Sequence, residues 1–134
     1  MSVVRGERLR LESSQDMLTV RHEVRAWAVA QGLNLVDQTK IVTAASELAR
    51  NALVYGGGGT ASLEALEDGQ RKGLRLTFED RGPGIADIAL AMTDGYTTSG
   101  GLGLGLSGAK RLVNEFEISS TPGEGTRVTV TRWK

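Results

Sequence analysis

The chain has 134 residues, enough to bury the core of one domain but too few for two ordinary domains, so we expect a single domain over residues 1–134. Its 16 Lys and Arg residues balance 16 Asp and Glu residues, so its charge favours neither a nucleic acid nor a membrane surface as partner. It has no cysteine, no segment resembling a signal peptide and no long apolar run, so we expect a cytoplasmic protein without disulfides or thiolate metal sites.

Hydrophobic periodicity divides the chain into strands and helices. Residues 3–12 alternate as a strand does, and Ser14 can cap a helix over 14–30 that ends at Gly32. A second helix over about 36–55 ends at four consecutive glycines. The later elements that we expect are strands over 60–67 and 73–80, a short helix near 86–93, a helix over about 103–115, and a hairpin of strands over 116–121 and 126–133. Helices cluster early and strands late, which favours an α+β two-layer sandwich with helices on one face of a mixed, mostly antiparallel sheet.

The second helix carries two polar residues at the border of its apolar stripe. Glu47 and Asn51 lie one turn apart on the same flank, whereas Arg50 points away from the core. The amide oxygen of Asn51 suits a Mg²⁺ whose other ligands are phosphate oxygens and water. Glu47 is the catalytic candidate, because its carboxylate can accept or orient the proton of an attacking hydroxyl. Taken alone, the pair also fits a solvated border on an ordinary amphipathic helix.

The strand over 73–80 ends in a carboxylate. Asp80 shares one face with a row of apolar side chains, Leu74, Leu76 and Phe78. An ionised carboxylate at the end of a buried row needs hydrogen-bond donors. Backbone N–H groups of residues 81–84 can supply some of them, and the amino group of an adenine can supply the rest. The competing interpretation is an Asp that caps its own loop in an Asx-turn.

A glycine-rich segment precedes the last helix. Residues 94–108 hold six glycines, and exposed N–H groups at the start of a helix can bind phosphate. The pattern over 103–108 fits a dinucleotide-binding loop only if a strand precedes it, and a polar loop does so here. A P-loop also fails, because Ala109 intervenes and no Ser or Thr follows Lys110. The remaining alternative is a flexible loop before a helix.

Four motifs therefore follow one another along the chain: Glu47–Asn51, Asp80–Gly84, Gly101–Gly105 and Gly123–Thr126. In this order they resemble the GHKL ATPase superfamily of gyrase, heat-shock chaperone, histidine kinase and mismatch-repair ATPase domains. The resemblance implies ATP and Mg²⁺ as ligands, with Asn51 on the metal and with Asp80, supported by Thr126, on the adenine amino group. The segment over about 85–100 would be a lid over the phosphates. The implied nucleotide-binding residues are Asn51, Asp80, Gly82, Gly84, Ile85, Gly101, Leu102, Gly103, Leu104, Gly105 and Thr126.

Features that other superfamily members have and this sequence lacks indicate the branch to which it is most similar. Gyrase and mismatch-repair members use a second domain to send a lysine to the γ-phosphate, and sensor histidine kinases carry a phosphoacceptor histidine on a helical domain. Here His22 is the only histidine, in the first helix. The stand-alone bacterial anti-sigma-factor serine/threonine kinases remain, and the segments 45–52, 80–85 and 97–103 look most similar to the stressosome switch kinases of the RsbT type. That type phosphorylates Ser or Thr on STAS-domain proteins and then activates a partner phosphatase, which we expect to be of the PP2C type.

Three functions stay open. The first is the switch kinase for a STAS protein, which we favour. The second is an anti-sigma factor of the same fold, which phosphorylates a STAS antagonist and sequesters a sigma factor. The third is a nucleotide-binding module without catalysis, against which the presence of Glu47 argues. The lid is short and Arg81 is its only obvious cation, so the sequence does not identify the residue that clamps the γ-phosphate.

Overall fold

The structure is a computed structural model that describes residues 1–93 and 105–134, in which five strands and four helices form. In chain order the elements are β1 (Ser2–Leu11), α1 (Ser14–Ala30), α2 (Leu35–Val54), β2 (Gly59–Asp68), β3 (Arg71–Asp80), α3 (Ile88–Ala91), α4 (Gly105–Arg111), β4 (Glu115–Thr121) and β5 (Gly125–Trp133). Each of them was predicted from the sequence, and the largest difference lies at the C-terminal end of α4.

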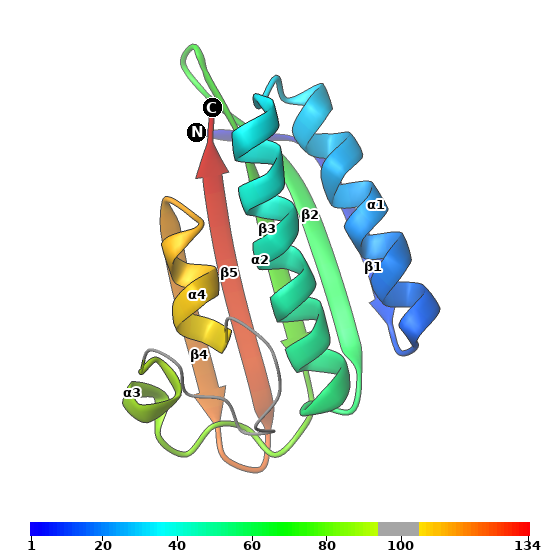
Figure 1. The fold of residues 1–134 in the computed structure, drawn as a ribbon, viewed down its shortest axis with the longest axis vertical. Coiled ribbons are helices and arrows are strands. Elements are labelled where there is room, and N and C mark those ends of the chain that lie inside the picture. Colours follow the sequence, from blue (N-terminus) through cyan, green and yellow to red (C-terminus); the bar gives the residue numbers. More distant parts are fainter. Residues whose placement is uncertain (94–104) are drawn as a thin grey trace.

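The strands form one sheet in the order β1-β2-β3-β5-β4. Helices α1, α2 and α4 lie over one face of this sheet, with α2 between the other two (Figure 1). This arrangement confirms the predicted α+β two-layer sandwich. The sheet is not mixed, however, because every neighbouring pair of described strands is antiparallel. Two successive helices connect β1 to β2. The first helix runs back along the sheet and the second returns, so β2 starts at the edge of the sheet where β1 ended and runs antiparallel to it.

Local hydrogen bonds set the ends of the helices. Helix α1 is capped by Ser13 rather than by the predicted Ser14: the Ser13 hydroxyl accepts the N–H of Asp16 at 3.1 Å. The Asp16 carboxylate in turn accepts the N–H of Glu12 at 2.9 Å. At the other end, Gly32 has a φ of +81°, a conformation that suits glycine and supports its predicted role after the helix.

Helix α4 ends at Arg111, four residues before the predicted end at 115. The helix ends early because Asn114 makes two hydrogen bonds with β5. Its N–H donates to the carbonyl of Thr131 at 2.9 Å, and its side-chain oxygen accepts the N–H of Trp133 at 2.7 Å. These contacts with β5 start β4 at Glu115 and exclude further helix.

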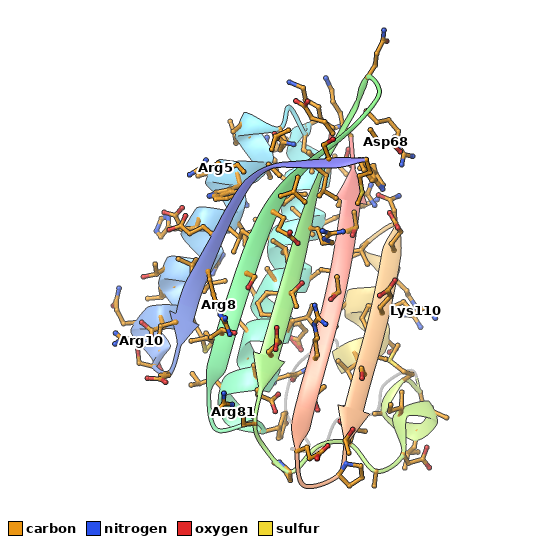
Figure 2. All side chains as sticks on the ribbon, turned by 180° about the vertical axis from the view of Figure 1, so that it is seen from behind. Arg5, Arg8, Arg10, Asp68, Arg81 and Lys110 are labelled. Atoms are coloured by element: carbon orange, nitrogen blue, oxygen red, sulfur yellow. The ribbon has the colours of Figure 1, made fainter. Side chains whose placement is uncertain are left out.

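The core lies between the helices and one face of the sheet. Trp27 of α1, Leu48 of α2 and Leu76 of β3 are all at most 2% exposed. The opposite face of the sheet, seen in Figure 2, is covered by no described helix and carries polar and charged side chains. Among the described residues, no helix is both long and apolar enough to cross a bilayer. The core therefore fixes α2 over the sheet and determines where its polar flank lies.

Candidate nucleotide-binding site

A cavity of about 540 Å³ opens between the C-terminal half of α2, the end of β3 and the start of β5. Its volume is in the range of small-molecule sites, which is about 300–1,000 Å³. The loop after β3, helix α3 and the start of α4 complete its wall, at the lower end of the molecule in Figure 1. The cavity thus collects segments from four separate parts of the chain.

Most of the predicted site residues that the structure describes line this cavity. Those that line it are Glu47, Asn51, Asp80, Gly84, Ile85, Gly105 and Thr126. Gly82 is described but is not part of the lining. Gly101, Leu102, Gly103 and Leu104 lie outside the described residues, as does the part of the predicted lid beyond residue 93.

Asp80 stands at the end of a buried row, as its spacing predicted. The other members of the row are buried and Asp80 itself is half-buried. Its Oδ1 accepts the N–H of Gly82 at 2.9 Å, so the Asx-type turn is present as well. Its Oδ2 has no hydrogen bond among the described residues. The two interpretations of Asp80 are therefore compatible, because one oxygen holds the loop and the other can accept a donor from a ligand.

Glycines surround Asp80 because backbone segments approach it closely. A Cβ atom placed on Gly56, just after α2, would overlap Cγ of Asp80. A Cβ atom on Gly125, at the start of β5, would overlap the Asp80 carbonyl. A Cβ atom on Gly82 would lie 2.5 Å from Cα of Gly56, so the loop after β3 packs directly against the end of α2. The sequence predicted Gly56 at the end of a helix and Gly125 within the last motif, but not their packing against Asp80, because these approaches join distant parts of the chain.

Thr126 is paired with Asp80 on the neighbouring strand, and it contacts Ser120, a residue that the sequence did not identify as part of the site. Asp80 and Thr126 are paired residues of β3 and β5. The Oγ atoms of Thr126 and Ser120 are 2.8 Å apart, and the Ser120 hydroxyl donates to the carbonyl of Gly125 at 3.0 Å. Ser120 Oγ also accepts the N–H of Ile85 at 2.7 Å. Because Ser120 has one proton to donate, the Thr126 hydroxyl is the donor in their contact, which leaves Thr126 Oγ1 able to accept.

Glu47 and Asn51 are half-buried on the flank of α2 that faces the cavity, as predicted. Glu47 Oε1 accepts the N–H of Gly105 at 3.2 Å. The side-chain amide of Asn51 makes no hydrogen bond to a described residue. No group of three or more His, Cys, Asp or Glu residues able to hold a metal exists in the described part of the chain. A Mg²⁺ at Asn51 would therefore need ligand phosphate oxygens and water, which is its usual preference.

The charges around the cavity are mostly negative. Glu47, Asp80 and Asp87 contribute carboxylates, and Arg50 is the one cation among the described lining residues. Arg81, which the sequence indicated as the obvious cation, is exposed and is not part of the lining. Figure 2 shows Arg81 near the lower end of β3, in the view from the opposite face of the sheet. Arg50, like Ser120, has a place in the site that its sequence position did not predict.

The donor and acceptor pattern of this cavity fits a purine nucleotide. Apolar side chains such as Phe78, Leu106 and Val128 can pack on a flat ring, and Asp80 can accept from an exocyclic amino group at the ring edge. Gly84 and Gly105 also line the cavity, and a glycine allows the backbone to approach a phosphate chain closely.

Comparison with known sequences agrees with this geometry. The sequence model of the family described as histidine kinase-, DNA gyrase B- and HSP90-like ATPases matches residues 36–134. The chain belongs to this ATPase family. The matched region contains all of α2 except its first residue, and every segment that lines the cavity.

Two relatives of similar length show which members of this ATPase family the chain resembles. The serine/threonine-protein kinase RsbT of Bacillus subtilis (strain 168) is 46% identical over 125 residues, which are 93% of this chain and 94% of the relative. An anti-sigma F factor of Thermoanaerobacter sp. (strain X514) is 30% identical over 129 residues, with 92% and 89% covered. The predicted resemblance to the RsbT type is confirmed, and the chain is a homologue of a serine/threonine-protein kinase.

Among solved structures, the RsbU and RsbW domains of Rv1364c from Mycobacterium tuberculosis align with a TM-score of 0.66 and 25% sequence identity. The alignment covers 98% of this chain and 33% of that longer chain. The similarity therefore spans the whole two-layer sandwich and supports the predicted fold class.

Proposed function

We propose that this protein is a serine/threonine-protein kinase that transfers the γ-phosphoryl group of ATP to a STAS-domain protein in a partner-switching stress pathway. One observation carries the proposal: Glu47, Asn51, Asp80 and Thr126 line a single cavity in a chain that is 46% identical to RsbT over nearly its full length. A partner phosphatase of the PP2C type would respond to the kinase once it is released.

In this proposal the adenine ring binds at the β3–β5 end of the cavity. The free Oδ2 of Asp80 would accept from the exocyclic amino group of adenine, and Thr126 Oγ1 offers a second acceptor beside it. Guanine carries an oxygen where adenine carries that amino group, so it would place two acceptors against each other. The site should therefore select ATP over GTP.

The phosphate chain would extend along α2 toward its middle. Asn51 would hold a Mg²⁺, which when bound neutralises charge on the phosphate oxygens. Residues of the loop after β3 and Gly105 line the same cavity and would offer backbone N–H groups to the phosphates. The segment of Gly101, Leu102, Gly103 and Leu104 is the predicted remainder of this phosphate cradle.

The reaction itself is a displacement at phosphorus. The hydroxyl oxygen of the acceptor Ser or Thr forms a bond to the γ-phosphorus, and the bond from this phosphorus to the β,γ-bridging oxygen breaks, which releases ADP. Glu47 orients the hydroxyl and receives its proton. Transition states of this kind are loose, so positioning contributes more than base strength does.

Phosphopeptide mapping tests this proposal. The protein is incubated with ATP, Mg²⁺ and a purified STAS-domain protein from the same genome, beside an Asp80→Asn variant. At an ATP concentration below the wild-type Kd, we expect phosphate on one Ser or Thr of the STAS protein with the wild type and far less with the variant. ATP binding without any phosphorylated product would contradict the kinase assignment and favour a nucleotide-binding module.

The similarity to anti-sigma F factors favours one alternative. At 30% identity over most of both chains, this protein could share their sequestration of a sigma factor. A pull-down with purified sigma factors separates the two functions, because a switch kinase should retain none. Capture of one sigma factor at stoichiometric amounts would make the anti-sigma function the better assignment.

A further inference from the structure

Arg50 lies between the two site residues of α2, Glu47 and Asn51, in the sequence. At about 100° per residue, Asn51 lies roughly 40° from Glu47 on one side and Arg50 roughly 60° from it on the other. Arg50 therefore begins on the outer flank of the helix, as the sequence indicated. Its side chain is nevertheless half-buried and lines the same cavity as Glu47 and Asn51.

The guanidinium of Arg50 has no anionic partner in the described part of the chain. No hydrogen bond or ion pair joins it to a described residue, whereas Arg75 pairs with Glu64 at 2.8 Å and Arg132 pairs with Asp37 at 2.6 Å. A partly buried arginine without a partner beside a cavity is suited to an anionic ligand, because its fork of N–H donors matches phosphate oxygens.

Positions along α2 indicate which phosphate would meet Arg50. Gly56, just after the helix, packs against Asp80 and so marks the adenine end of the cavity. At about 1.5 Å per residue, Asn51 lies roughly 7 Å further along the helix axis, Arg50 roughly 9 Å and Glu47 roughly 13 Å. Arg50 thus lies between the proposed metal ligand and the proposed catalytic carboxylate. The γ-phosphoryl group must lie in this interval, because Glu47 acts on the hydroxyl that attacks it.

We propose that Arg50 binds the γ-phosphoryl group of ATP and supplies the cationic contact that the short lid does not provide. The inference rests on the proposed kinase function. Arg50 neutralises charge on the group that is transferred, and it distinguishes ATP from ADP because only ATP carries that group. Arg81 does not fill this role, since it is exposed and lies outside the cavity lining.

Calorimetric titration with ATP and with ADP, both with Mg²⁺, tests this inference without any phosphoryl transfer. In Arg50→Gln we expect the Kd for ATP to rise roughly tenfold, as for the loss of one charge-assisted contact, and the Kd for ADP to change less than about twofold. Arg50→Lys keeps the charge but not the fork, so it should show a smaller, still ATP-selective loss. Arg21→Gln, on the exposed face of α1, is the matched control and should change neither value.

Other outcomes would overturn the inference. An equal rise for both nucleotides, no change for either, or an ATP-selective loss in Arg81→Gln instead would show that Arg50 is not the γ-phosphate contact. Unchanged nucleotide binding with a raised KM for the STAS protein would assign Arg50 to protein docking. If Arg50→Gln does not fold, the same comparison of the Kd values for ATP and ADP in Arg50→Lys tests the inference. Failure of the wild type to bind either nucleotide would contradict the proposed function itself, which keeps the two failures distinct.

Discussion

Glu47 Oε1 accepts a hydrogen bond from the backbone N–H of Gly105, with 3.2 Å between oxygen and nitrogen. The contact joins the proposed catalytic carboxylate on α2 to Gly105, the first residue of α4. In the proposed complex, a phosphate oxygen would compete with this carboxylate for the N–H group of Gly105. Nucleotide binding should free Glu47 for the acceptor hydroxyl.

Removal of this carboxylate should affect turnover more than binding. In Glu47→Gln we expect kcat for phosphoryl transfer to fall by about a hundredfold or more, because the acceptor hydroxyl loses its proton acceptor. The Kd for ATP should change less than about threefold, since Glu47 competes with phosphate rather than binding it. Steady-state kinetics and calorimetry measure the two effects. A loss of affinity as large as the loss of kcat would refute this division of roles.

Asp80→Asn should affect ATP binding more than turnover. An Asn side chain still offers an oxygen to the N–H of Gly82, so the loop should stay folded. Loss of the charge weakens the proposed bond to the adenine amino group, and we expect the Kd for ATP to rise by about 10- to 100-fold. Circular dichroism melting checks the fold beside the titration. Wild-type affinity in this variant would remove Asp80 from the binding site.

Gly56→Ala tests the close packing that shapes the adenine end. An added Cβ would overlap Cγ of Asp80, so we expect a loss of about 1–3 kcal/mol in the free energy of unfolding together with weaker ATP binding. Gly6→Ala in β1 is the matched control, because its nearest atom would be the Leu63 carbonyl at 3.9 Å. Chemical denaturation measures both variants. Equal stability of the two would contradict the packing argument.

Ser120→Ala tests the hydroxyl that connects three segments of the site. The change leaves the N–H of Ile85 without its acceptor and releases the Thr126 hydroxyl, so unfolding should require about 1–3 kcal/mol less free energy. ATP affinity should fall as well, because Ile85 and Thr126 both line the cavity. Ser119→Ala, its exposed neighbour on the same strand, should have neither effect. Identical behaviour of the two variants would exclude a supporting role for Ser120.

The cap of α1 predicts a pH dependence that is independent of the site. The backbone N–H of Glu12 is the largest cause that lowers the pKa of Asp16 below its ordinary value of 3.8, with the charge of Arg10 also contributing. A lowered pKa in the folded state means that Asp16 stabilises the fold at neutral pH and that this contribution disappears as the pH falls through the lowered value. The difference in melting temperature between wild type and Asp16→Asn should therefore shrink on acidification below pH 3.8. A difference that grows toward low pH would contradict this.

Much of the site could be predicted from periodicity within single elements. The helical repeat placed Glu47 and Asn51 on one flank of α2, and strand alternation placed Asp80 at the end of a buried row. Both placements need only local geometry, which a sequence pattern records.

The remainder depends on where distant segments meet, and no local pattern records that. Gly56 is required only because the end of α2 passes Asp80, and Ser120 acts only because β4 lies beside β5 near the loop of Ile85. Arg50 begins on the outer flank of α2, so its place in the cavity lining could not be predicted from the helical wheel. The antiparallel pairing of β1 with β2 likewise follows from the two-helix connection between them rather than from the sequence of either strand.

Transfer of label from γ-³²P-ATP to a STAS-domain protein tests the central claim most directly. With Mg²⁺, ATP below the wild-type Kd and the wild-type protein, we expect acid-stable label on the STAS protein, and with Asp80→Asn we expect labelling about 10- to 100-fold slower. Acid stability distinguishes a phosphorylated Ser or Thr from a phosphorylated His. The account would be contradicted if the wild type bound ATP but left every STAS candidate unlabelled, or if Asp80→Asn transferred label as fast as the wild type.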